Sequence, residues 1–175
     1  FHVGCTAGST LILNSTAAQD GTRDAFYNAG DGPVDSQFIY SKDDFVASGG
    51  GKRTILYAWT GIEGYSKFGS YEGNGNADGT FVYTGFRPKL VIVKNIDASN
   101  NWIINDSVRS PNNPITGGSS TIYADTTNQE SDLSTDVDFL SNGFKARTTG
   151  GHRNATNTYI FMAFAEMPFK YANAR

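Results

Sequence analysis

The sequence is short of the residues that build covalent and metal-linked frameworks. It has one cysteine and two histidines, which do not stand at the spacing of a zinc site. Because Cys5 is the single cysteine, no disulfide can form within the chain, and stability does not depend on an oxidising compartment. No apolar run approaches the roughly 18 residues of a membrane-spanning helix, so we expect no membrane span.

Charge is also scarce. Charged residues make up 18% of the chain, and the formal net charge is −3. Because the lysines and arginines are scattered, the chain lacks the basic surface of a nucleic-acid-binding protein. Glycine (20 residues) and aromatic residues (13%) are abundant instead, which excludes both a disordered chain and a helical bundle. We expect no cofactor.

Hydrophobic residues recur with a period of two, which is typical of strands. Short apolar stretches are separated by turn residues and predict an all-β chain, an antiparallel β-sandwich or jelly-roll-like module. The expected strands are Thr10–Leu13, Gln37–Tyr40, Arg53–Thr60, Ser66–Glu72, Thr80–Tyr83, Leu90–Ile96, Trp102–Asp106, Ser120–Ala124, Val137–Leu140, Gly143–Arg147 and Thr158–Glu166.

The pattern within some stretches also predicts central strands, a hairpin turn and one turn of helix. Leu90–Ile96 and Thr158–Glu166 are apolar on both faces and are expected to be central strands with both sides covered, as is Arg53–Thr60. The pair Asn142-Gly143 predicts a tight hairpin turn. One turn of helix is expected within Thr127–Ser134.

An internal repeat divides the chain. Phe45-Val46-Ala47, a glycine-rich turn and the strand ending at Trp59 match Phe144-Lys145-Ala146 and the strand ending at Phe164. Residues 1–64 are therefore interpreted as the C-terminal half of a preceding module, and residues 65–175 as a complete β-sandwich module. A half module cannot bury its own face, so we expect upstream sequence or a neighbouring chain to cover it. A homo-oligomer, with a trimer favoured, is the expected working unit.

Motifs for catalysis are absent from the sequence. Ser66 lies in an expected strand, and the glycines around it do not have the spacing of a nucleophile elbow. The spacing pairs none of the turn carboxylates as a glycosidase would need; these are Glu72, Asp78, Asp106, Asp125 and Glu130. We therefore expect no catalytic residues and no enzymatic activity.

The segment Asn74–Gly79 is faintly similar to a calcium-binding loop. It has asparagine at the first ligand position and no glutamate at the distance of a bidentate ligand. A plain hairpin loop is the favoured interpretation, and no metal site is expected.

Aromatic residues are the remaining candidates for a binding surface. Rings can stack on sugars while loop side chains supply hydrogen bonds, although core packing is the default for each ring. The candidate glycan-binding residues are Trp102, Tyr83, Tyr123, Arg109, Asn112 and Asn113, and Phe86 and Tyr71 are further aromatic candidates. The sequons at Asn14, Asn105 and Asn154 are attributed to chance in a chain rich in asparagine and threonine.

Several longer motifs resemble a known family. They are Tyr65-Ser66-Lys67-Phe68-Gly69-Ser70-Tyr71, Phe81-Val82-Tyr83-Thr84-Gly85-Phe86-Arg87-Pro88, Phe139-Leu140-Ser141-Asn142-Gly143-Phe144-Lys145 and the stretch from Tyr159 to Lys170. Together they resemble a domain of uncharacterised function that occurs, often in tandem, in tail-fibre and other virion proteins of tailed phages, many of them marine. The resemblance covers residues 54–175 and implies a β-sandwich, trimeric assembly and a place on the virion exterior, at the tail or the capsid surface.

Three functions are consistent with this resemblance. The first is a tail-fibre or receptor-binding module that contacts a host glycan or protein, and other virion proteins, without catalysis. The second is a capsid decoration or cement protein. The third is a polysaccharide-degrading tailspike, which needs a convergent carboxylate pair.

Overall fold

A computed structural model describes residues 4–5, 9–21, 57–109, 111, 113, 120–132 and 137–166. Within these residues the chain forms strands and no helix. The strands are β1 (Ser66–Glu72), β2 (Phe81–Tyr83), β3 (Pro88–Asn95), β4 (Ile103–Asp106), β5 (Ser120–Tyr123), β6 (Ser131–Asp132), β7 (Val137–Leu140), β8 (Gly143–Ala146) and β9 (Thr158–Ala165).

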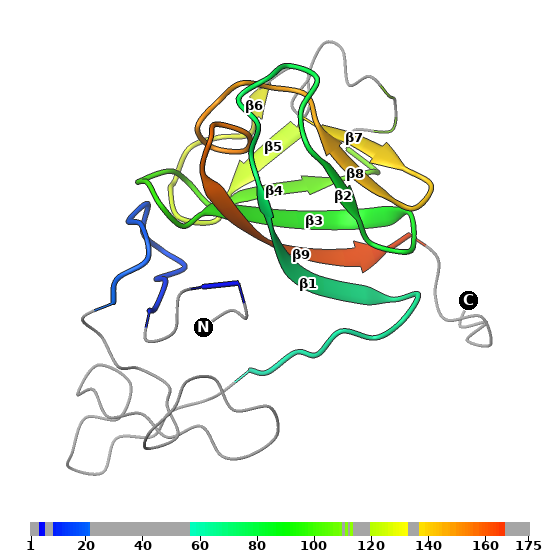
Figure 1. The fold of residues 1–175 in the computed structure, drawn as a ribbon, viewed down its shortest axis with the longest axis horizontal. Coiled ribbons are helices and arrows are strands. Elements are labelled where there is room, and N and C mark those ends of the chain that lie inside the picture. The colour runs from blue at the N-terminus through cyan, green and yellow to red at the C-terminus, as the bar shows by residue number, and fades with distance from the viewer. Residues whose placement is uncertain are drawn as a thin grey trace.

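The strands form two antiparallel sheets (Figure 1). The larger sheet has the order β1-β9-β3-β4-β5-β6, and the smaller has the order β2-β8-β7. Strands β3 and β9 are adjacent at the centre of the larger sheet, as their two-sided apolar pattern predicts. The expected β-sandwich is confirmed.

The main core lies between the two sheets. Along β9, Tyr159, Phe161 and Ala163 point toward the smaller sheet, because alternate side chains of a strand face opposite sides. They pack on buried residues from both sheets and the adjoining loop: Tyr71, Val82, Phe86, Val91, Val93, Val137, Phe139 and Phe144.

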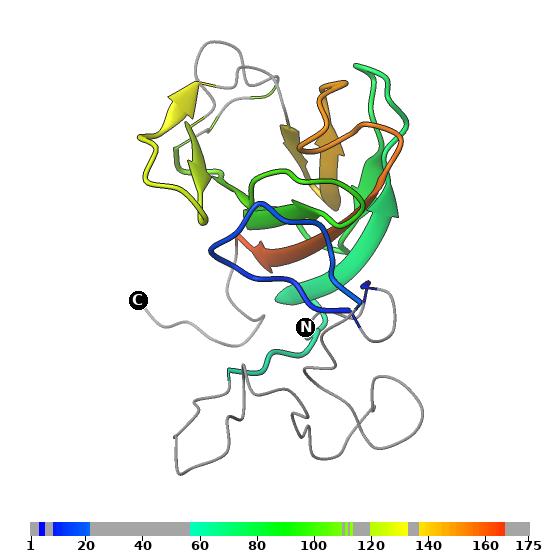
Figure 2. The ribbon, with the colours of Figure 1, turned by 90° about the vertical axis from the view of Figure 1, so that its left-hand side faces the viewer.

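Residues 9–21 lie against part of the opposite face of the larger sheet (Figure 2). On this face Ile160 and Met162, the intervening residues of β9, form part of a second apolar cluster. Leu11 and Cys5 pack against that cluster. Hydrogen bonds hold the segment: Trp102 Nε1 donates to the carbonyl oxygen of Ile12 at 3.0 Å. This segment therefore covers part of the second face of the central strands, and no local sequence pattern indicates that it would do so.

Lys94 is a fully buried lysine beneath this segment. Its Nζ donates to the main-chain oxygens of Thr16 at 3.2 Å and Asn95 at 2.7 Å. Burial lowers the pKa of Lys94 to about 8, and the nearby Asp125 and Cys5 act in the opposite direction.

Two expected strands differ from the structure. Tyr57–Thr60, the described part of Arg53–Thr60, is not a strand; Tyr57 is 72% and Trp59 65% exposed, and their rings stack on each other. No neighbouring strand among the described residues pairs with this stretch. In Thr10–Leu13 there is only an isolated bridge from Thr10 to Asp20. Gln37–Tyr40 lies outside the described residues.

One local prediction was wrong, and another was confirmed with its turn shifted by one residue. The described part of Thr127–Ser134 contains no helical turn but the short strand β6, which pairs with β5. The β7–β8 hairpin exists, but its turn residues are Ser141 and Asn142, and Gly143 already pairs with Leu140. Gly143 meets a packing need instead, because a Cβ there would lie 2.2 Å from the carbonyl oxygen of Val82.

Truncating Phe161 tests the core between the sheets. This side chain is 3% exposed and packs edge-to-face on Phe144, with ring centroids 5.5 Å apart. Phe161→Ala is expected to lower the free energy of unfolding by about 3–5 kcal/mol, measured by urea denaturation. Phe81→Ala, at a ring that is 43% exposed, is the control and should cost much less. Equal losses in the two variants would contradict this core.

The change of stability with pH in the alkaline range tests the pKa shifts of one buried lysine and two buried tyrosines. Between pH 8 and 10, the unfolded chain keeps a lysine proton that folded Lys94 has lost, so stability should rise with pH. Burial also raises the pKa of Tyr71, and that of Tyr159 to about 12, so the folded chain keeps protons that unfolded tyrosines lose above pH 10. The contribution of these three groups should therefore peak near pH 10 and then fall.

Urea denaturation at pH 7–11 measures this profile. Lys94→Met should remove the rising limb between pH 8 and 10 and leave the fall above pH 10. Parallel profiles for the wild type and Lys94→Met would contradict the assignment.

Candidate functional site

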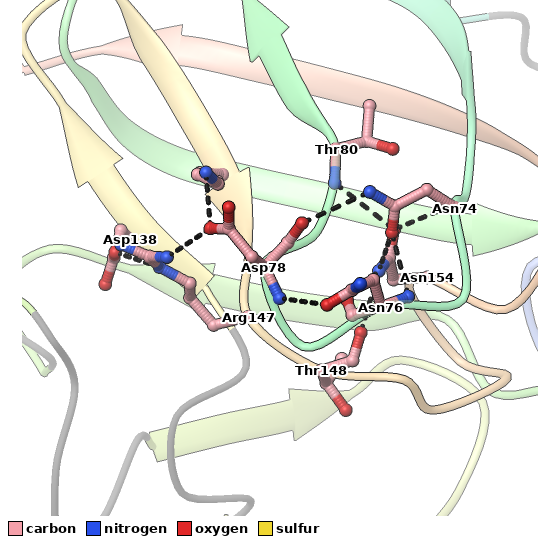
Figure 3. Close-up of polar contacts among 9 residues, drawn as sticks. Asn74, Asn76, Asp78, Thr80, Asp138, Arg147, Thr148 and Asn154 are labelled. Atoms are coloured by element: carbon pink, nitrogen blue, oxygen red, sulfur yellow. Dashed lines mark hydrogen bonds and ion pairs between the residues drawn. The ribbon is translucent and has the colours of Figure 1, made fainter.

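The loop between β1 and β2 is built around the side chain of Asn154, which comes from the loop between β8 and β9 (Figure 3). Asn154 is fully buried. Its Nδ2 donates to Asn74 Oδ1 at 2.8 Å, the carbonyl oxygen of Asn76 at 2.7 Å and that of Thr148 at 2.8 Å. Its Oδ1 accepts from the main-chain nitrogens of Asn74 and Thr80. One side chain thus joins both loops.

This arrangement accounts for the faint similarity of Asn74–Gly79 to a calcium-binding loop. The oxygens of Asn74 and Asn76 converge on an amide nitrogen. Asn76 Oδ1 accepts from the main-chain nitrogen of Asp78, as in an Asx turn. Among the described residues no group of three or more histidine, cysteine, aspartate or glutamate side chains is placed to hold a metal ion.

A chain of alternating charges continues from this loop across the smaller sheet. Asp78 Oδ1 lies 2.6 Å from Lys145 Nζ and 2.8 Å from Arg147 Nη1. The Nε of Arg147 in turn lies 2.5 Å from Oδ2 of Asp138. The hydrogen bond from Lys145 holds the pKa of Asp78 below its usual range, and the bond to Asp138 raises the pKa of Arg147. Asp78 therefore lies between two cations, and Arg147 lies between two carboxylates.

Strand register places two aromatic rings beside these charges. Phe81 pairs with Lys145 and Tyr83 with Gly143, so both rings share the outer face of the smaller sheet with Lys145. Phe81 is 43% and Tyr83 58% exposed. Lys67 Nζ lies 4.9 Å from the centre of the Tyr83 ring and donates to the carbonyl oxygen of Tyr83 at 3.0 Å. We call this surface, formed by Phe81, Tyr83, Asp78, Asp138, Lys145 and Arg147, the small-sheet face.

The aromatic residues singled out from the sequence lie in different places. Tyr83 belongs to the small-sheet face. Trp102 is 6% exposed and packs under residues 9–21, so its ring is not at the surface. Tyr71 and Phe86 are in the main core. Tyr123 is partly buried in β5, next to Ile103 of β4.

The polar candidates lie apart from Tyr83. Arg109 follows β4 and bridges Asp106 at 3.0 Å and Glu130 at 3.2 Å. The side chain of Asn113 bonds to both main-chain polar groups of Phe139 and so pins its loop to the edge of β7. Asn112 lies outside the described residues.

Sequence reasoning missed most of the small-sheet face. Phe81, two residues before Tyr83 in a strand, was the available signal, because this spacing places two rings on one face. Asp138 and Arg147 gave no signal, since only the pairing of β7 with β8 brings them together. Of the three sequons, Asn105 and Asn154 are buried, so the folded chain does not present them for glycosylation.

Comparison with known families gives one match. A family described as "Domain of unknown function (DUF7483)" matches residues 1–168. The chain belongs to the DUF7483 family. Searches of the curated proteins and of the solved structures give no match. The DUF7483 match runs across residue 64, and the division into a half module and a complete module stays a prediction.

The structure of this DUF7483 chain also tests whether a helix could span a membrane. None of the described residues forms a helix that is long and apolar enough to cross a bilayer.

Proposed function

We propose that this chain is a non-catalytic module of a tailed-phage virion appendage, a tail fibre or receptor-binding protein, that contacts the host surface. The observation that carries the proposal is the small-sheet face. It places exposed rings next to fixed hydrogen-bonding groups on a rigid β-sandwich, a combination suited to recognition. The resemblance of the sequence motifs to those of virion proteins supports a location on the virion exterior.

The environment of the carboxylates supports binding without catalysis. Asp78 and Asp138 are bridged by Arg147, and Asp106 and Glu130 are bridged by Arg109. A glycosidase needs one carboxyl that is protonated and a second that attacks or activates water, whereas each of these carboxylates is already paired with an arginine side chain. Incubation with host capsule or lipopolysaccharide should release no reducing ends, and reproducible cleavage would favour the tailspike alternative.

A binding assay tests the recognition surface. Fluorescently labelled chain should adhere to cells of the host bacterium, and Phe81→Ser/Tyr83→Ser should reduce adhesion at least about tenfold, the loss expected from removing two stacking rings. Val108→Ser, at an apolar side chain that is 67% exposed, is the control and should adhere like the wild type. Unchanged adhesion of the double variant would place recognition elsewhere.

We also propose that the module works as a homo-oligomer, with a trimer favoured. β1 is one of the two edge strands of the larger sheet and β2 one of those of the smaller, and edge strands can pair with other chains. The stacked and exposed rings of Tyr57 and Trp59 precede β1 and add apolar surface. Light scattering of the purified chain should give a trimer whose unfolding midpoint rises with concentration, whereas a concentration-independent monomer would contradict the proposal.

A further inference from the structure

Asp138 has an unusual environment for a carboxylate. Its side chain is 5% exposed. One oxygen, Oδ2, pairs with Arg147 Nε, while the other, Oδ1, is buried and has no hydrogen-bond donor within the part of the chain that the structure describes. Buried polar atoms in folded proteins nearly always have a partner, so an acceptor without one is a place where a donor from outside the chain fits.

The position of this acceptor links it to the exposed rings. Asp138 pairs with Lys145 across β7 and β8, and Lys145 pairs with Phe81 across β8 and β2. A carboxylate, an ammonium group and a ring therefore follow one another across three neighbouring strands. Since strands lie about 4.8 Å apart, the row is about 10 Å long, which suits a ligand of one or two sugar rings.

The charges of the row indicate the kind of ligand. Asp78 and Asp138 balance Lys145 and Arg147. Lys67, which donates to the carbonyl oxygen of Tyr83, adds a single positive charge at the edge of the row, so the row has no cluster of like charges that would select an ion. Carboxylates accept hydrogen bonds from hydroxyl groups, and lysine and arginine donate to ring and hydroxyl oxygens. Exposed rings such as Phe81 and Tyr83 stack on the apolar face of a sugar.

We propose that the small-sheet face is a binding site for a neutral saccharide unit, with Asp138 Oδ1 accepting a hydroxyl hydrogen bond. Phe81 and Tyr83 stack on the sugar, and Lys145 and Arg147 donate to its oxygens. Arg147, whose side chain is 37% exposed, shifts to admit the hydroxyl group. This inference rests on the proposed recognition function and deepens it, because it names the ligand class.

Titration followed by NMR tests the site. The probes are the methyl glycosides of glucose, galactose, mannose and N-acetylglucosamine, with lactose and cellobiose as neutral disaccharides and galacturonate and N-acetylneuraminate as charged comparisons. At least one neutral probe should shift the amide signals of β2 and β8. Asp138→Asn, which keeps the size of the side chain, should weaken that binding at least tenfold. Glu130→Gln, in the ion pair with Arg109, is the matched control and should bind like the wild type.

The other outcomes are each decisive. No shift on β2 and β8 with any neutral probe, or wild-type binding by Asp138→Asn, overturns the site. If Asp138→Asn does not fold, Tyr83→Ala at the exposed ring takes its place, and its unchanged affinity overturns the site equally. A chain that adheres to host cells but binds no neutral probe contradicts this inference alone, whereas a chain that does neither contradicts the proposed function as well.

Discussion

Replacing Gly73 by alanine is expected to lower the free energy of unfolding by about 3 kcal/mol or more. A Cβ at this position would lie 1.9 Å from the carbonyl oxygen of Ala155 and 2.9 Å from the Tyr159 ring. The nearest atom belongs to the backbone, so no side-chain rotation relieves the clash. Gly73 also donates its N–H to the carbonyl oxygen of Asn157, which ties the end of β1 to the loop before β9.

Urea denaturation of Gly73→Ala measures this cost. Gly61→Ala is the control, because a Cβ there would meet only the carbonyl oxygen of Ser66 at an ordinary 3.7 Å. The control should change the free energy of unfolding by less than about 1 kcal/mol. A Gly73→Ala variant as stable as the control would show that the two loops do not approach each other this closely.

Replacing Asn154 by alanine is expected to have the second large effect, a loss of about 3–5 kcal/mol of unfolding free energy. The change leaves the main-chain nitrogens of Asn74 and Thr80 without this acceptor, and three oxygens without their shared donor. Because this polar cluster is partly buried, water replaces the lost bonds poorly. The resonances of both loops should broaden or shift together.

Asn76→Ala provides the control for Asn154→Ala. Its side chain is exposed and, among the described residues, accepts one hydrogen bond, from the main-chain nitrogen of Asp78, so the loss should be about 1 kcal/mol or less. If Asn154→Ala costs no more than Asn76→Ala, Asn154 is not the anchor of the two loops.

The sequence predicted the sheets better than it predicted what surrounds them. The bounds of β1 and β7 match the expected strands, because their alternation is local and turn residues flank both. The two-sided pattern of β3 and β9 indicated a cover on each face. It did not show that residues 9–21 form one of the covers, since Trp102 and Lys94 contact that segment across 90 and 78 residues of chain, respectively.

The same limit applies to the candidate site. Tyr83 was predicted from its aromatic character, but Asp78, Asp138 and Arg147 come from three separate segments. Their ion pairs depend on the order β2-β8-β7 and on its register, which no local pattern encodes. The sequence marks Asn154 only as a sequon. Its structural role, which is to join the two loops, depends on its burial, and the sequence does not reveal that burial.

Radical footprinting on the host envelope is the most direct test of the claim that the small-sheet face is the recognition surface. The chain would be oxidised in solution and while bound to cell envelopes of the host bacterium, and side-chain oxidation would be quantified by mass spectrometry. We expect binding to protect Phe81 and Tyr83, while Val108, exposed on the turn after β4, keeps its free rate of oxidation. Protection of Val108 with unchanged oxidation of Phe81 and Tyr83 would contradict the account.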